Sequence, residues 1–382
     1  MSRIAQLGVL LALLAANLYW SRPHYNWDMV AYIGVAFRFA GASDEVAHER
    51  TYRALRQSVP AEDYELLTQA DAYRRTVAAD YRAFAQQLPF YSVKPIYPLK
   101  IALLTQTGVD PVRASVIVSG AAYLLIGAIL FLWLSSFLRG FTIVAVTWVI
   151  MSLPFMLDLA RGSTPDAMST AVVLTALWLL MEKEWLWPAL ALLVVSIGVR
   201  PDNLLWVFAI AGYAAVRLRN VRVAALFSAA GTAVYLLLAS WSDNAGWRTL
   251  FHHSFVERLA FPQDFEPVLT VPGYVWIYLR ESHPVNLPTF LLLMLLIAAC
   301  IFVGLLRRHG RGDARVVLLA AMGGFAVLHW LVYPGEDRFM AAAYAAVLVL
   351  LVRALVHEDP SSHAAARPPA HPASTAMTRE NV

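Results

Sequence analysis

An arginine and a carboxylate recur together in three short segments that separate apolar runs. The pairs are Arg161 with Asp166, Arg200 with Asp202, and Arg338 with Glu336 and Asp337. Charged groups at membrane depth are expensive and are usually functional when they face a cavity. Asp or Asn before a helix and Pro in its first turn are also ordinary helix caps, and this alternative stays open for each segment taken alone.

A further carboxylate, Asp28, follows the first apolar run, and Lys94 comes later in the polar stretch beyond it. Arginine presents planar, bidentate donors to phosphoryl oxygens. A carboxylate among cations suits a general base or a metal ligand. A phosphate-bearing substrate at a membrane surface is most simply a lipid, so the pattern predicts transfer of a group from a lipid phosphate donor.

The composition places these residues in a polytopic membrane protein. The 382 residues are 59% hydrophobic and 15% charged, whereas soluble domains average about 45–50% apolar and about 25% charged residues. The net charge of +4 does not indicate nucleic acid binding, because the cations are distributed along the chain and form no patch. Cys300 is the single cysteine, so no disulfide within the chain is possible.

We expect an all-α polytopic membrane protein of about ten transmembrane helices. The first covers Ile4 to Trp20, with a cleaved signal peptide as the alternative. The others are expected at 112–137, 141–157, 165–181, 185–199, 203–216, 222–241, 288–306, 315–332 and 339–356. Residues 1–357 then form one membrane domain, and the Pro- and Ser-rich residues 358–382 are expected to be a disordered cytoplasmic tail.

Two long polar stretches, 21–98 and 242–287, are expected to be external loops. In the first we expect two helices divided at Pro60, then an extended segment over 89–98 and a short helix over 99–109. The adjacent His252 and His253 in the second loop have no distinctive metal-ligand spacing.

The distribution of Lys and Arg over the short loops predicts the orientation. One set of loops contains Arg139, Lys183, Arg217, Arg219, Arg222, Arg307, Arg308, Arg311 and Arg315, and the other contains only Arg161, Arg200 and Arg338. Both termini are therefore expected in the cytoplasm of a plasma (inner) membrane protein. Asp28 and the three arginine and acid segments then face the extracytoplasmic side.

These segments resemble motifs of the GT-C superfamily of membrane glycosyltransferases, which use polyprenyl-phosphate sugars. The matching residues are Asp28 with Tyr32, Ala160-Arg161 with Pro165-Asp166, Arg200-Pro201-Asp202, and Glu336-Asp337-Arg338. Protein mannosyltransferases and the lipid A aminoarabinose transferase are members. The similarity extends over most of the chain to about residue 356, as architecture and short motifs.

The resemblance implies that Asp28 deprotonates an acceptor hydroxyl, which attacks the anomeric carbon of the sugar with inversion. Arg161, Arg200 and Arg338 would contact the leaving phosphate. The substrate site would then be completed by Tyr32, Lys94, Asp166, Asp202, Glu336 and Asp337. The implied partners are a polyprenyl-phosphate sugar, an acceptor that is a glycan, a lipid or a protein, and membrane lipids.

The sequence departs from that family at Asp28, where many members have two adjacent acidic residues. Asp28 lies between Trp27 and Met29, and the nearest acidic pair is Asp44-Glu45. A divalent metal is therefore weakly supported, and Asp44 or Glu45 stays open as the base, with Asp28 favoured. The alternative functions are a transporter or flippase of a lipid-linked saccharide, a non-catalytic assembly factor, and another lipid-phosphate enzyme.

Overall fold

A computed structural model describes residues 1–266, 268, 270–285, 287–306, 314–332 and 337–356. Over these residues the chain is helical, apart from an isolated β-bridge between His24 and Gly162. The expected cytoplasmic tail lies outside the described residues, as do Arg307, Arg308, Arg311 and Glu336.

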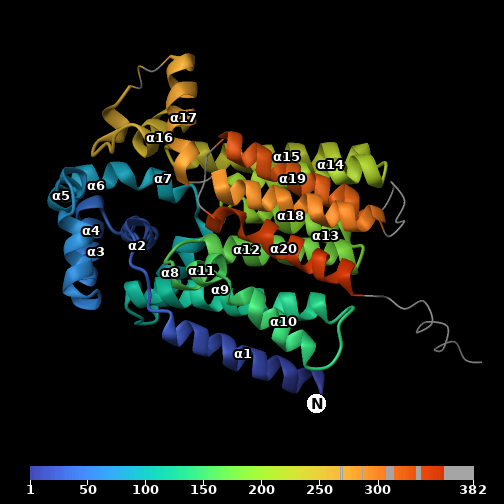
Figure 1. Cartoon of the computed structure of the whole chain (residues 1–382). Helices are drawn as coiled ribbons and strands as arrows, with labels where there is room; N and C mark the ends of the chain where they lie inside the picture. Colours follow the sequence, from blue (N-terminus) through green and yellow to red (C-terminus); the bar gives the residue numbers. More distant parts are fainter. Residues whose placement is uncertain (267, 269, 286, 307–313, 333–336, 357–382) are drawn as a thin grey trace, which may run out of the picture.

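Apolar helices form a bundle in which the longer ones run side by side (Figure 1). They are α1 (Arg3–Trp20), α9 (Pro111–Leu134), α10 (Thr142–Met151), α11 (Pro154–Arg161), α12 (Asp166–Glu182), α13 (Leu186–Ser196), α14 (Leu204–Arg217), α15 (Val221–Trp241), α18 (Leu287–Leu306), α19 (Ala314–Val332) and α20 (Asp337–Leu355). In its buried core, the Trp206 and Phe325 rings stack at 4.0 Å. Gly127 lets α9 approach α1 closely, because a Cβ there would collide with Leu14.

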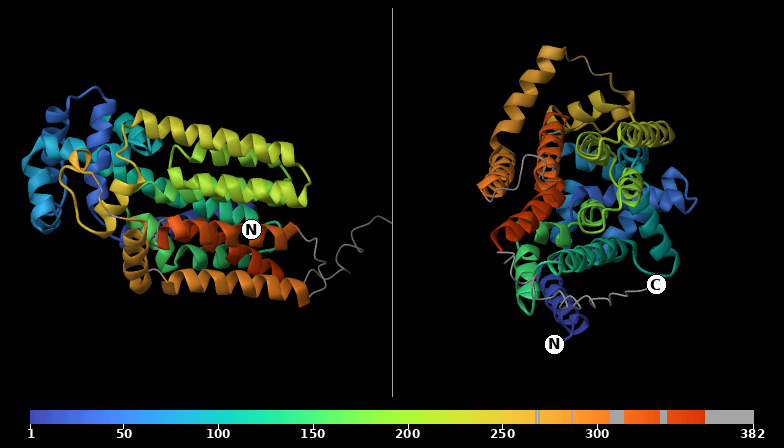
Figure 2. Two further views of the ribbon diagram at one scale, coloured as in Figure 1. Left: turned by 90° about the horizontal axis from the view of Figure 1, so that it is seen from above. Right: turned by 90° about the vertical axis from the view of Figure 1, so that its right-hand side faces the viewer.

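Both polar stretches that were expected to be external loops lie at the same end of the bundle (Figures 1 and 2). The first forms α2 (Trp27–Phe39), α3 (Asp44–Ser58), α4 (Ala61–Gln69), α5 (Ala72–Ala79), α6 (Tyr81–Gln87) and α7 (Pro89–Ser92), and α8 (Ile96–Gln106) leads back into the bundle. The second contains α16 (Trp247–Phe255), a 3₁₀ turn η2 (Pro262–Asp264) and α17 (Val271–Val285). Gln87 joins the two stretches, because its amide donates to the carbonyl oxygens of Leu259 and Ala260.

The first polar stretch breaks at Pro60, as expected, and differs from its expected structure after that break. Three helices, α4, α5 and α6, follow Pro60 where one was expected. The prediction of an extended segment over 89–98 is wrong, because α7 and the start of α8 occupy it. Pro89 begins α7 and Pro95 caps α8, positions where a helix needs no backbone N–H donor.

Four of the described helices are long and apolar enough to cross a membrane: Arg3–Trp20, Pro111–Leu134, Val221–Trp241 and Arg338–Leu355. A fifth span results if α10 and α11, which meet at an angle of 70°, are counted together. The 11 residues of α13 rise about 17 Å, which is short of a hydrocarbon core of about 30 Å. The chain is therefore a membrane protein by these helices, and the total of ten spans stays a prediction.

Candidate functional site

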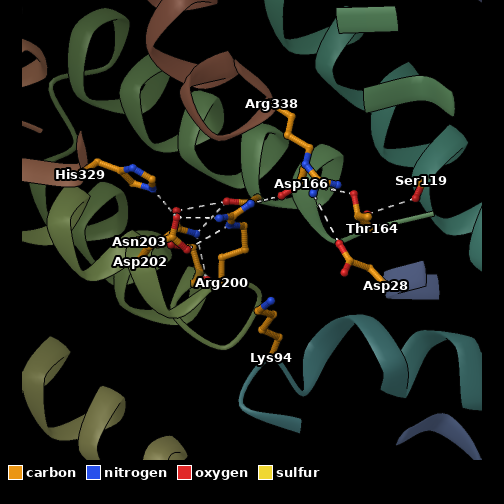
Figure 3. Close-up of polar contacts among 12 residues, drawn as sticks. Asp28, Lys94, Ser119, Thr164, Asp166, Arg200, Asp202, Asn203, His329 and Arg338 are labelled. Atoms are coloured by element: carbon orange, nitrogen blue, oxygen red, sulfur yellow. Dashed lines mark hydrogen bonds and ion pairs between the residues drawn. The ribbon is translucent and has the colours of Figure 1, made fainter. Parts of the chain in front are cut away.

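Six charged or ionisable side chains gather at the end of the bundle that α2–α7 cover (Figures 1 and 3). Arg200 and Asp202 come from one short segment and the others from separate places in the chain, and most of the six lie at a helix start. Asp166 begins α12, Arg200 caps the 3₁₀ turn η1 (Pro201–Asn203) before α14, and Arg338 is the second residue of α20. Asp28 is the second residue of α2, Lys94 lies between α7 and α8, and Asp202 lies within η1.

Arg200 is the most constrained of these cations. Its Nε and NH2 donate to the two carboxylate oxygens of Asp202 at 2.9 and 2.8 Å, and its NH1 pairs with Asp166. The Phe339 ring lies 3.9 Å from the guanidinium carbon and covers one of its faces. Only 11% of the Arg200 side chain and 2% of the Asp166 side chain are exposed, so charge pairing compensates the burial.

Arg338 links this pair to Asp28. Its NH1 lies 3.4 Å from Asp166 Oδ2, and its NH2 lies 3.4 Å from Asp28 Oδ2. The Thr164 hydroxyl donates to Asp166 Oδ2 at 2.6 Å. Charge-assisted N–H···O bonds are usually about 2.7–2.9 Å long, so Arg338 holds these two carboxylates more loosely than Arg200 holds Asp202.

Asp28 is an ionised carboxylate beside aromatic hydroxyls. The Tyr91 hydroxyl donates to its Oδ1 at 3.0 Å. Burial alone would raise the pKa of Asp28, but the charges of Arg338 and Lys94 outweigh it and hold the pKa below its usual value. Asp28 is therefore unprotonated at neutral pH and available to accept a proton.

Lys94 faces the same space, with its Nζ 3.1 Å from the Tyr32 hydroxyl (Figure 3). The Tyr32 and Tyr91 rings both lie under its ammonium group, at 5.6 and 5.4 Å. Burial and the charge of Arg200 lower the pKa of Lys94 to about 8. The amine is therefore a cation at neutral pH that titrates just above it.

Most of the residues that the sequence singled out meet here, but Arg161 does not. Its side chain is exposed and its Nε donates to the carbonyl oxygen of Arg22 at 3.2 Å. Tyr32 lies in the site, whereas Glu336 is outside the described residues and Asp337 is placed only as the start of α20. The expectation that three arginines converge therefore reduces to Arg200 and Arg338.

Asp44 and Glu45, the alternative bases, lie away from these cations. Asp44 begins α3 and accepts a bond of 2.6 Å from Arg38, with 41% of its side chain exposed. Glu45 is exposed. Because Asp28 contacts Arg338 directly and these two contact no residue of the site, the geometry favours Asp28.

Three contributing residues were not singled out from the sequence: Tyr91, Phe339 and His329. His329 Nε2 lies 2.9 Å from Asp202 Oδ2, and its side chain is 1% exposed. A histidine near the end of an otherwise apolar run was the one available signal for it. Tyr91 and Phe339 carried no distinguishing pattern.

Among the described residues, no three His, Cys, Asp or Glu side chains are grouped to hold a metal ion. The carboxylates of the site are instead paired with guanidinium groups. His253 packs against Tyr73 and Phe90, and its Nδ1 accepts from the Leu259 backbone N–H at 3.1 Å. Burial and the charge of Arg258 lower the pKa of His253 to about 4, so it is a neutral packing group.

The arrangement provides anion contacts beside a base. Arg200 uses three of its N–H groups on Asp202 and Asp166. A guanidinium has five N–H groups, so two have no partner among the described residues and are available to a ligand. Arg338 and Lys94 supply two more positive charges between Arg200 and Asp28. Neither protein-family profiles nor characterised proteins nor solved structures gave a match to this chain, so its function is argued from this site.

Proposed function

We propose that the chain is an integral membrane glycosyltransferase that moves a sugar from a polyprenyl-phosphate donor to an acceptor hydroxyl. One observation carries the proposal: Asp28 lies 3.4 Å from Arg338, which also reaches Asp166 and thus Arg200, at the polar end of an apolar bundle. A base and a group of cations at that depth fit a substrate with an isoprenoid tail, a phosphate and a sugar. The motif resemblance noted above points to the same class.

In the proposed reaction the acceptor O–H hydrogen-bonds to Asp28. As the acceptor oxygen bonds to the anomeric carbon from the face opposite the phosphate, the bond between that carbon and the phosphate oxygen breaks. The proton passes to Asp28 and the electron pair leaves with the polyprenyl phosphate, so the product has inverted anomeric configuration. Because charge develops on the leaving phosphate, fixed cations favour the transition state.

The cations that would contact the phosphate are Arg200, Arg338 and Lys94. Arg200 is held on an edge by Asp202 and on a face by Phe339, so its remaining N–H groups have a fixed direction. Arg338 is held by longer contacts to Asp28 and Asp166, which a phosphate can replace at little cost. Lys94 adds a point charge that does not require a particular ligand geometry.

We place this site on the extracytoplasmic face. The two large polar stretches lie at its end of the bundle, and the turn between α14 and α15 lies at the other end (Figures 1 and 2). Arg217, Arg219 and Arg222 lie in that turn or at the helix ends beside it, and clusters of this kind are retained on the cytoplasmic side. The start of α1 and the end of α20 lie at the same end as this turn.

Transport of a lipid-linked saccharide is the second candidate, and the 70° bend between α10 and α11 favours it, because transporters often use broken helices. Transporters place their ionisable groups near the bilayer midplane. Here the charged groups of the site come from helix starts and from the short connections between helices, not from helix centres. The position of the charges therefore favours group transfer.

The test uses the purified protein in lipid nanodiscs. Native mass spectrometry should detect co-purified or added long-chain polyprenyl phosphate on the wild type, and Arg200→Met should weaken this binding by at least tenfold. Arg161→Met is the matched control, because Arg161 is an arginine of the same end of the bundle whose side chain is exposed and outside the site.

A panel of radiolabelled polyprenyl-phosphate sugars would then be screened for release of free polyprenyl phosphate and transfer to a membrane extract. Flux of intact labelled lipid across liposomes without cleavage would favour the transporter. Equal polyprenyl phosphate binding by Arg200→Met, Arg161→Met and the wild type would refute the proposed site.

A further inference from the structure

His329 is a polar side chain in a helix that is otherwise almost entirely apolar. Over its described length α19 is apolar except for Arg315 near its start and His329 in its last turn. The imidazole is 1% exposed and lies against the Phe325 and Phe339 rings, at 5.7 and 5.8 Å. A buried polar group costs free energy unless it has a hydrogen-bond partner, and the partner of His329 is Asp202.

The tautomer of His329 follows from that contact. A carboxylate only accepts hydrogen bonds, so the Nε2 atom, 2.9 Å from Asp202 Oδ2, carries the proton. Nδ1 has no hydrogen-bond partner among the described residues. The bond from Nε2 to Asp202 is therefore the one hydrogen bond that the imidazole makes within the described part of the chain.

Asp202 accepts hydrogen bonds from both His329 and Arg200, so the orientation of its carboxylate affects the orientation of Arg200. Its Oδ2 accepts from His329 and from Arg200 NH2, while its Oδ1 accepts from Arg200 Nε. The Asp202 side chain is 27% exposed, so without His329 water could compete for Oδ2 and the carboxylate could rotate. Phe339 lies against both His329 and Arg200. The same ring therefore packs against the histidine that donates to Asp202 and against the arginine that Asp202 orients.

We propose that His329 is a positioning residue that, through Asp202, fixes the direction in which Arg200 presents its remaining N–H groups to the donor phosphate. The inference rests on the proposed function, because it names how the phosphate ligand of that site is oriented. It predicts that His329 affects phosphate affinity only through Arg200.

The first experiment measures the affinity of the full-length protein for polyprenyl phosphate in nanodiscs. His329→Leu removes the donor at similar volume and should weaken binding by about tenfold, the lower end of the range found for residues that orient the ligands of a metal ion. His329→Gln keeps an N–H donor and should restore most of the affinity. Met322→Ala is the packing control, because Met322 is fully buried in the same helix, about 10 Å away along its axis; it should lower the Tm and leave the affinity unchanged.

The second experiment is a double-mutant cycle in the Arg200→Lys background. If His329 acts through Arg200, His329→Leu should change the affinity less than twofold there, because lysine cannot keep the bidentate bond to Asp202. An additive tenfold loss, or failure of His329→Gln to restore binding, would overturn the inference while the proposed function stands. A wild type that binds no polyprenyl phosphate would instead refute the proposed function, and the role of His329 would fall with it.

Discussion

Replacing Asp28 by asparagine removes a charge and a proton acceptor but keeps the size of the side chain. The amide oxygen can still accept from the Tyr91 hydroxyl, which now lies 3.0 Å from Oδ1. The lost attraction to Arg338, at 3.4 Å, is about 5 kcal/mol between unit charges at an effective dielectric constant of about 20. Because 35% of the Asp28 side chain is exposed, solvent screening reduces the net loss of stability to about 1 kcal/mol.

The effect on transfer should be much larger than the effect on stability. A general base contributes about 10²–10⁴-fold in rate, which corresponds to about 3–5 kcal/mol of activation free energy. Binding of polyprenyl phosphate should be unchanged or tighter, because the substitution removes a negative charge next to the phosphate ligand Arg338. Turnover and donor affinity should therefore separate in this variant.

The assay compares initial rates of sugar transfer with donor affinity for Asp28→Asn and Asp44→Asn in the same detergent or nanodisc preparation. Asp44→Asn is the matched control, because it breaks a half-exposed pair with Arg38 that is worth about 0–1 kcal/mol; its turnover should stay within threefold of the wild type. If Asp28→Asn keeps more than a third of wild-type turnover while Asp44→Asn loses it, the base is on α3 and the reasoning from the Arg338 contact is wrong.

Four further predictions concern Lys94, Asp166 and the orientation of the chain in the membrane. Lys94 loses its charge as the pH rises through about 8, so affinity for polyprenyl phosphate should fall between pH 7 and 9, and a Lys94→Met variant that kept this dependence would exclude Lys94 as its cause. The unfolded chain holds the Lys94 proton up to about pH 10.5, so the ligand-free protein should gain stability from this group between about pH 8 and 10.5. Asp166→Asn leaves Arg200 buried with one carboxylate and should cost about 3 kcal/mol, measured as a lower Tm; an unchanged Tm would contradict the buried pairing. In a Cys300→Ser background, an impermeant maleimide should label Ala61→Cys from outside the cell and Arg217→Cys only after permeabilisation, and the reverse pattern would invert the proposed orientation.

Most bundle helices could be located from the sequence because polar or basic residues bound their apolar runs. The expected 222–241 and 315–332 correspond to α15 and α19 within one residue at each end. The expected single span over 141–157 is instead broken before Pro154, where Leu153 is extended and the two halves meet at 70°. Proline disfavours a helical conformation in the residue before it, and hydropathy does not register this.

Which residues come together in the site depends on how the helices return to one end of the bundle. Residue spacing in the sequence does not specify this. Asp166 is five residues from Arg161 but pairs with Arg200, 34 residues away. Helices α12 and α13 are joined by a short turn and pack against each other, so the end of α13 returns beside the start of α12. Arg161 instead contacts the segment after α1: the His24 N–H donates to its carbonyl oxygen at 2.9 Å, and its Nε donates to the carbonyl oxygen of Arg22.

The same return of the chain explains why His329 could not be assigned a role from its neighbours in the sequence. It ends an apolar helix, and its partner Asp202 is 127 residues earlier in the chain. Repetition of arginine and acid on one predicted side of the membrane was sufficient to predict that charges gather, but each Arg was paired with the acid nearest in sequence. In the structure the Arg200 guanidinium is shared between carboxylates from different segments of the chain. A substitution at one of these carboxylates therefore changes the orientation of Arg200 and of the groups bonded to it. The effects of Asp166, Asp202 and His329 variants on binding should then not add.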